Sequence, residues 1–198
     1  MNNEMEELNG IAWRDVLMNT VIGFVCIIGV MALMITMKAK AEQEGAIPPG
    51  NLIVHAVWPS GDTDIDLWVN GPGEPVPVGY SNKGGLLWNL LRDDLGIQPD
   101  ATDINYEDAA TRGVIGGEYT INVHCYRCPT LPQKVDLEAS INTGEPGKAS
   151  LKVLATTHVT LVSAGQEATG MNFILREDGT IEPNSLNQVF RPLRSGKK

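Results

Sequence analysis

The longest apolar run of the chain lies near its N-terminus. No charged residue occurs from Val16 to Met37. A helix over this range is about 33 Å long, close to a bilayer hydrocarbon core of about 30 Å. The pattern predicts one transmembrane helix, which we place at residues 15–38.

A cleaved signal peptide is the alternative, because "AKA" at Ala39–Ala41 is similar to a cleavage site. The length of the run and the acidic residues before it favour the membrane helix.

Polar and small residues on this helix recur at steps of three or four. Asp15, Asn19, Cys26 and Gly29 share one helical face, and the remaining faces are apolar. A polar stripe on a membrane helix usually faces protein or water rather than lipid. Asp15 is therefore a candidate ion-carrying group, with Asn19 and Thr20 as supporting polar groups. Alternatively, Asp15 is a first-turn acid that lies among the headgroups and favours the positive end of the helix dipole.

The pattern changes to period two after residue 50. Residues 39–50 are polar and then proline-rich, which is typical of a linker. Beyond them, Ile65, Leu67 and Val69 fall on one face of an extended segment. The segments with this alternation lie at 51–58, 64–73, 118–126, 134–142, 148–155, 157–164 and 168–178.

Gly, Pro and Asn turns separate these segments. Several short strands with frequent turns predict a mainly-β domain, an antiparallel β-sandwich of about eight strands over residues 51–182. We expect residues 84–108 to form a long loop or one or two helical turns. We expect residues 183–198 to form a frayed C-terminal tail.

Composition narrows the range of functions. The formal net charge of −9 argues against a nucleic-acid partner, because phosphate binding needs a basic surface. The sequence contains no G-x-S-x-G, H-E-x-x-H or P-loop motif, so we expect no enzymatic activity.

The motif "GDTDIDLW" places Asp62, Asp64 and Asp66 at alternate positions. Ca²⁺ prefers several oxygen ligands, and these three carboxylates could supply them. The glycine and glutamate of an EF-hand loop are missing, so we expect these acids to lie on the solvent face of a strand or in a turn, and a calcium site is the alternative. Calcium is the one cofactor that the sequence suggests.

The motif "CYRC" contains Cys125 and Cys128. A zinc site would need four ligands, and besides the adjacent His124 only His55 and His158 remain. A disulfide that closes a tight turn at a strand end is favoured if the domain lies in an oxidising compartment, although free thiols are also compatible with the motif.

The segment "WRDVLMNTVIGFV" resembles the transmembrane signature of the ExbD/TolR/MotB family, the ion-conducting subunits of proton-driven membrane motors. Trp13, Asp15 and Phe24 occupy the family's aromatic, acidic and apolar positions, whereas Ala12 replaces a proline that some members carry. The resemblance implies that Asp15 carries protons. It also implies a homodimer inside a pentameric ring of multi-pass MotA/TolQ/ExbB-like subunits, a 5:2 complex.

The motif "VWPSGDTDIDLWVNGPG" resembles an uncharacterised bacterial family in which a similar helix precedes a β domain. It differs from the peptidoglycan-binding domain of MotB. The resemblance implies a single-pass protein of the bacterial inner membrane, with a short acidic cytoplasmic tail at 1–14 and a periplasmic β domain that acts on an unknown partner. The lysines after the helix weakly favour the opposite orientation. The alternative function is a membrane-anchored periplasmic binding or scaffold module for a glycan, calcium or a protein, with an inert anchor.

Overall fold

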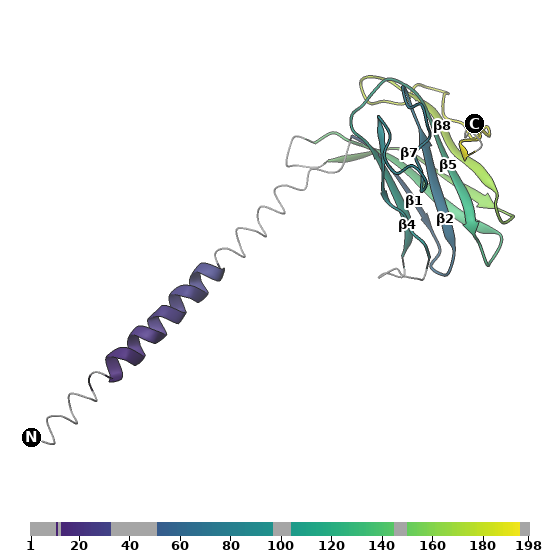
Figure 1. The fold of residues 1–198 in the computed structure, drawn as a ribbon. Helices are drawn as coiled ribbons and strands as arrows, with labels where there is room; N and C mark the ends of the chain where they lie inside the picture. The colour runs from purple at the N-terminus through teal and green to yellow at the C-terminus, as the bar shows by residue number, and fades with distance from the viewer. Residues whose placement is uncertain (1–10, 12, 33–50, 97–103, 145–149, 195–198) are drawn as a thin grey trace, which may run out of the picture. The chain divides into compact units, whose positions relative to one another are not determined.

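The structure is a computed structural model that describes residues 11, 13–32, 51–96, 104–144 and 150–194. The chain divides into two compact units, Met1–Ala46 and Ile47–Lys198. The described residues of the first form a helix, and those of the second form eight β-strands (Figure 1). Residues 1–10 of the predicted acidic tail and the whole predicted linker lie outside the described residues.

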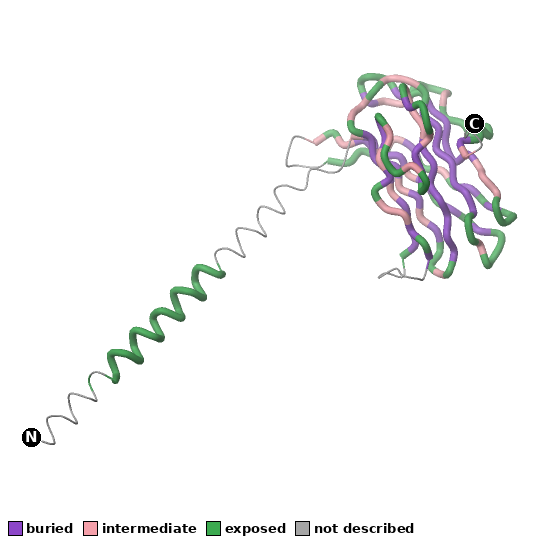
Figure 2. Tube along the Cα trace, in the orientation of Figure 1, coloured by how far each residue is buried: buried purple, intermediate pink, exposed green. Residues whose placement is uncertain are grey.

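The N-terminal helix runs over Trp13–Ala32 and is long and apolar enough to cross a membrane by length and composition. Every described side chain on it is exposed (Figure 2). An apolar helix whose described side chains are all exposed fits a membrane anchor rather than the core helix of a globular domain. Residues 33–38 of the predicted helix lie outside the described part of the chain.

The second unit is the predicted antiparallel β-sandwich. Its strands are β1 (Leu52–Trp58), β2 (Asp64–Asn70), β3 (Trp88–Arg92), β4 (Asn105–Thr111), β5 (Gly117–Arg127), β6 (Gln133–Asn142), β7 (Leu151–Leu161) and β8 (Glu167–Leu175). A five-stranded sheet has the order β3-β4-β1-β6-β7, and a three-stranded sheet has the order β2-β5-β8. All strand pairs are antiparallel. The predicted fold class is confirmed.

The core lies between the two sheets (Figure 2). Alternate residues of β1 point into it, as the period-two pattern predicts. Tyr119 is at its centre, stacked on Phe173 with ring centroids 5.5 Å apart and met edge-on by Trp88 at 6.0 Å. All three side chains are almost completely buried. Each buried large apolar side chain stabilises the fold by about 1.5–3 kcal/mol, so this group is a major part of the core.

Two expectations about the strands are wrong. Residues 84–108 do not form a loop or helical turns throughout, because they contain β3 and the beginning of β4. The two strands expected at 148–155 and 157–164 are one strand, β7. The register between β6 and β7 shifts near Ala155, which reverses the alternation of inward and outward side chains within one strand.

The predicted C-terminal tail is wrong for residues 183–194. Asn187 pairs with Asn172 of β8 through two backbone hydrogen bonds of 2.7 and 2.9 Å. Further along, the amide of Leu193 donates to Glu167 Oε1 at 2.8 Å, and the Leu193 side chain is buried. This segment therefore completes the sandwich beside β8, whereas residues 195–198 lie outside the described residues.

A close packing contact covers the outer face of β2. Gly79 lies against the Trp68 ring, and a Cβ at Gly79 would be 2.6–2.8 Å from three ring atoms. We expect Gly79→Ala to lower the free energy of unfolding by about 1–3 kcal/mol, because a buried ring cannot move aside freely. Urea denaturation of the full chain, followed by tryptophan fluorescence, measures this change. The control is Gly113→Ala, where no atom lies within 4 Å of the added Cβ; equal losses for the two variants would contradict the packing argument.

Candidate functional site

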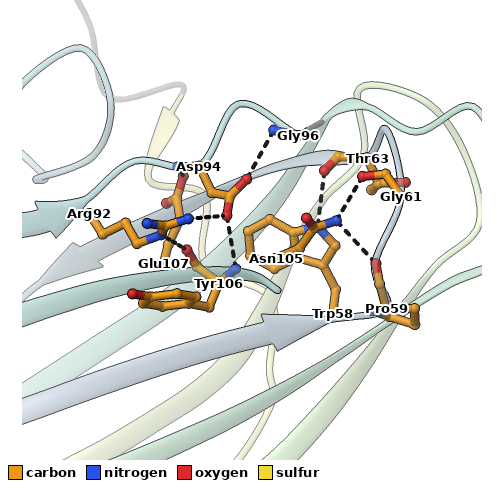
Figure 3. Close-up of polar contacts among 10 residues, drawn as sticks. All are labelled: Trp58, Pro59, Gly61, Thr63, Arg92, Asp94, Gly96, Asn105, Tyr106 and Glu107. Carbon is orange, nitrogen blue, oxygen red and sulfur yellow. Dashed lines mark hydrogen bonds and ion pairs between the residues drawn. The ribbon is translucent and has the colours of Figure 1, made fainter. Parts of the chain in front are cut away.

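The acidic residues of the sandwich gather where the edge strand β2 approaches β4 of the other sheet. β2 pairs with β5 on one side only within its sheet. Three segments meet at its other side: the β1–β2 loop, the residues directly after β3, and the beginning of β4 (Figure 3). This meeting point contains most of the buried charge in the described part of the domain.

The β1–β2 loop is fixed by side chains at both ends. The indole Nε1 of Trp58 donates to the Thr63 carbonyl at 3.0 Å. The amide Nδ2 of Asn105 donates to the carbonyls of Pro59 and Gly61 at 3.1 and 2.9 Å (Figure 3). Since Trp58 and Asn105 are themselves buried, the loop is held in one conformation at the entrance to β2.

Asp94 organises the segment after β3. One carboxylate oxygen accepts the Gly96 amide at 2.9 Å, and the other accepts the Tyr106 amide at 3.1 Å and Arg92 Nη2 at 3.0 Å (Figure 3). The Arg92 guanidinium also lies over the Tyr106 ring, 4.2 Å from its centroid. Through these hydrogen bonds Asp94 holds the segment after β3 against the beginning of β4.

Glu107 joins the two sheets. Its side chain is fully buried, although it belongs to β4 of the five-stranded sheet. Oε2 accepts the Leu67 amide of β2 at 2.7 Å, and Oε1 accepts the Asp94 amide at 3.2 Å. The carboxylate thus satisfies an amide at the free edge of β2. Burial raises the pKa of Glu107 well above its usual value.

Carboxylate oxygens of Asp66, Asp93 and Glu107 lie within 4.8 Å of one another. Asp66 and Glu107 are buried, and Asp93 is only slightly exposed. Asp66 is oriented by His124, whose Nδ1 is 2.7 Å from Asp66 Oδ2. Asp93 Oδ2 pairs with Lys83 at 2.7 Å. These three acids and Asp64 are called the carboxylate pocket below.

Asp64 is a fourth acid of this region, two residues before Asp66 on β2. Only 3% of this residue is exposed. Burial, and to a smaller extent the charge of Asp66, raise the pKa of its carboxyl to about 6. Among the described residues, Asp64 Oδ1 and Asp93 Oδ1 are buried and have no hydrogen-bond partner, and His124 Nε2 is in the same situation. Leaving buried polar atoms unpaired costs about 1–3 kcal/mol each, so the pocket lacks complementary positive charge or donors.

Cys125 and Cys128 are bonded as a disulfide at the end of β5. Neither sulfur is therefore available to zinc. The short loop that they close contains Arg127, which donates to Asp62 Oδ1 at 2.8 Å and to the Leu95 carbonyl at 2.6 Å. The loop thereby connects the β1–β2 loop to the segment after β3.

The structure separates the three aspartates of the sequence motif. Asp62 is half-exposed and paired with Arg127, while Asp64 and Asp66 enter the pocket. The expectation that these acids lie on the solvent face is wrong for Asp64 and Asp66, because His124 and Asp93 lie against that face.

Asp93 and Glu107 belong to the site although no sequence motif indicates them. Both lie in residues 84–108, where the pattern predicts a loop or helical turns, which does not place them beside the motif. The available signal was the group of acids at "RDD" and "NYED" in this segment.

The helix carries the second group of candidate residues. Asp15 and Asn19 are exposed, one helical turn apart. The Thr20 hydroxyl donates to the Val16 carbonyl at 2.8 Å, so it is used within the helix. Asp15 and Asn19 remain as the free polar groups of the predicted stripe near the start of the described helix.

Comparison with known proteins gives no relative: no protein-family model, curated protein or solved structure matches the chain. Function must therefore be argued from the helix and the carboxylate pocket.

Proposed function

We propose that the protein is the ion-carrying subunit of a proton-driven membrane motor, with Asp15 as the proton carrier. The observation that carries the proposal is the position of Asp15, the one acidic residue of the helix Trp13–Ala32, at the start of a polar stripe. A charge at a membrane boundary is costly, and protonation removes it. Each proton that moves down a potential of 100 mV releases about 2.3 kcal/mol, which can drive movement of the helix against its partners.

In this proposal two copies of the chain lie inside a pentameric ring of multi-pass MotA/TolQ/ExbB-like subunits. Two helices in a ring of five have unlike surroundings, so the two Asp15 residues exchange protons alternately. The chain acts as a proton carrier and not as an enzyme. The sequence resemblance of residues 13–25 to the ExbD/TolR/MotB family supports this arrangement.

We place the sandwich in the periplasm and the N-terminus in the cytoplasm of a bacterial inner-membrane protein. The Cys125–Cys128 disulfide supports this orientation, because disulfides persist in oxidising compartments. The sandwich then transmits the movement of the helix to a periplasmic partner.

The second candidate is a membrane-anchored periplasmic binding module. The observation that favours it is the carboxylate pocket, which is built into the sandwich and needs nothing from the helix. In this case the helix is an inert anchor, and Asp15 is only a first-turn acid.

Replacing the helix distinguishes the two candidates. Residues 13–37 are exchanged for an unrelated apolar membrane helix without an acid, with membrane insertion confirmed. We expect copurification of a multi-pass partner with the native chain and its loss from the exchanged chain, because partner contacts require the native helix. Undiminished copurification after the exchange would contradict the motor proposal and favour the inert anchor.

A further inference from the structure

We propose that the carboxylate pocket of the sandwich binds one calcium ion. This inference is independent of the motor proposal, because it concerns only the second unit of the chain. It also changes the ligand set that the sequence motif suggests, since Asp62 pairs with Arg127. Asp93, directly after β3, and Glu107, in β4, take part instead.

The spacing of the carboxylates suits calcium. Ca²⁺ binds oxygen at about 2.3–2.6 Å, so two ligands on opposite sides of the ion are about 4.6–5.2 Å apart. One oxygen from each of Asp66, Asp93 and Glu107 lies within 4.8 Å of the others, inside this limit. Three carboxylates at this distance repel one another unless a cation or protons lie among them.

Unpaired buried oxygens supply independent support. Asp64 is nine-tenths or more buried, and its Oδ1 lacks a partner among the described residues. Asp64 and Asp66 alternate along β2 and share a face, and the charges of both Asp66 and Asp93 act on the Asp64 carboxyl. Asp93 Oδ1 is buried and unpaired in the same part of the described chain. A cation held by Asp66, Asp93 and Glu107 would offset the charge of Asp93 and, through its field, that of Asp64.

Nearby cations do not neutralise the pocket fully. Lys83 contacts Asp93 Oδ2 and is more than half exposed, so its flexible side chain can move into solvent. Arg92 is engaged with Asp94. Arg127 pairs with Asp62, and its charge also acts on Asp64, where it lowers the pKa of the carboxyl. The negative charge of the four carboxylates therefore exceeds the positive charge that acts on them.

The donor set distinguishes calcium from other metals. All ligands are carboxylate oxygens, and both cysteines of the domain are in a disulfide, which argues against zinc. The acids come from β2, from the segment after β3, and from β4, so their arrangement is irregular. Ca²⁺ accepts irregular coordination by six to eight oxygens, including carbonyls and water, whereas Mg²⁺ requires a near-ideal octahedron.

Binding would also strengthen the junction between the sheets. The ligands belong to both sheets, and Figure 3 shows Glu107 next to Asp94, which fixes the segment containing Asp93. An ion that binds only the folded state stabilises that state by mass action. Calcium is therefore expected to raise the unfolding temperature of the sandwich.

The test uses the full chain in detergent, freed of metal with EDTA and then dialysed. We expect CaCl₂ at about 100 times its dissociation constant to raise the Tm by roughly 5–10 °C. The same concentration of MgCl₂ should raise it by far less. Calorimetric titration with CaCl₂ then gives the dissociation constant. Asp93→Asn keeps the shape of the side chain and should weaken calcium binding at least about tenfold, because affinity depends on the number of charged ligands.

The matched control is Asp136→Asn, which removes an exposed carboxylate that pairs with Lys134 on β6. It should bind calcium as the unmodified chain does. Three results would overturn the proposal: no calcium-dependent heat or Tm change, equal stabilisation by Mg²⁺, or unchanged affinity in a folded Asp93→Asn variant. The first of these results would mean that protons alone relieve the repulsion among the carboxylates of the pocket.

Discussion

Replacing Asp15 by Asn is expected to reduce proton flux through the motor complex at least about 100-fold, the scale on which a positioned proton-transfer group contributes. Asparagine has nearly the same size and caps a helix equally well, so insertion and helix stability should not change. It cannot release a proton, and therefore removes only the proposed carrier. Proton uptake into proteoliposomes that contain the purified complex, driven by an imposed potential and followed with a pH-sensitive dye, measures the effect.

Two controls separate proton transfer from simple charge loss. Asp15→Glu keeps a carboxyl group and should retain part of the flux, whereas Asp136→Asn removes an exposed carboxylate elsewhere and should retain all of it. If Asp15→Asn conducts protons as well as the unmodified chain, Asp15 is a capping or headgroup residue, and the inert-anchor alternative holds.

Replacing Glu107 by Ala is expected to be the most destabilising single change in the sandwich. It leaves the buried amides of Leu67 and Asp94 without an acceptor and opens a cavity at the junction of the sheets. Each unsatisfied buried amide costs about 1–3 kcal/mol, so the total loss is about 3–5 kcal/mol. A domain of this size has about 5–15 kcal/mol of stability, and a large part of it would disappear.

Urea denaturation in EDTA measures this loss separately from any cation effect. With a slope of about 2 kcal/mol per molar urea, the midpoint should fall by about 1.5–2.5 M. The control is Glu118→Ala at an exposed position of β5 that pairs with Arg191, where a change within about 1 kcal/mol is expected. A loss below about 1 kcal/mol for Glu107→Ala would show that the bridge between the sheets contributes little.

Strands can be predicted from the sequence where inward and outward residues alternate without interruption. β1, β5 and β6 were predicted within a few residues, and Ile65, Leu67 and Val69 are completely buried as the pattern of β2 indicates. The apolar helix was equally clear, because an uncharged apolar run of that length is typical of a transmembrane helix.

Prediction failed where polar residues occupy inward positions. Glu107 points into the junction of the sheets from β4, so the alternation that identifies a strand is broken at the residue that matters most. In β7 the irregularity near Ala155 divided one strand into two apparent ones. Departures of this kind are expected at functional sites, where the chemistry of a residue takes precedence over the pattern.

The carboxylate pocket could not be assembled from the sequence for a topological reason. Asp66, Asp93 and Glu107 belong to three segments that meet only because β4 lies beside the free edge of β2. Local pattern gives the strands but not which edges approach each other. The acids of "GDTDIDLW" were visible, and the partners that complete the pocket were not.

Counting the subunits of the intact membrane complex is the decisive test of the motor proposal. The full chain is tagged at its C-terminus, purified in mild detergent with whatever it binds, and weighed by native mass spectrometry. We expect two copies of this chain with five copies of one multi-pass membrane protein. The chain alone, or with partners that lack a five-fold ring, would contradict this expectation.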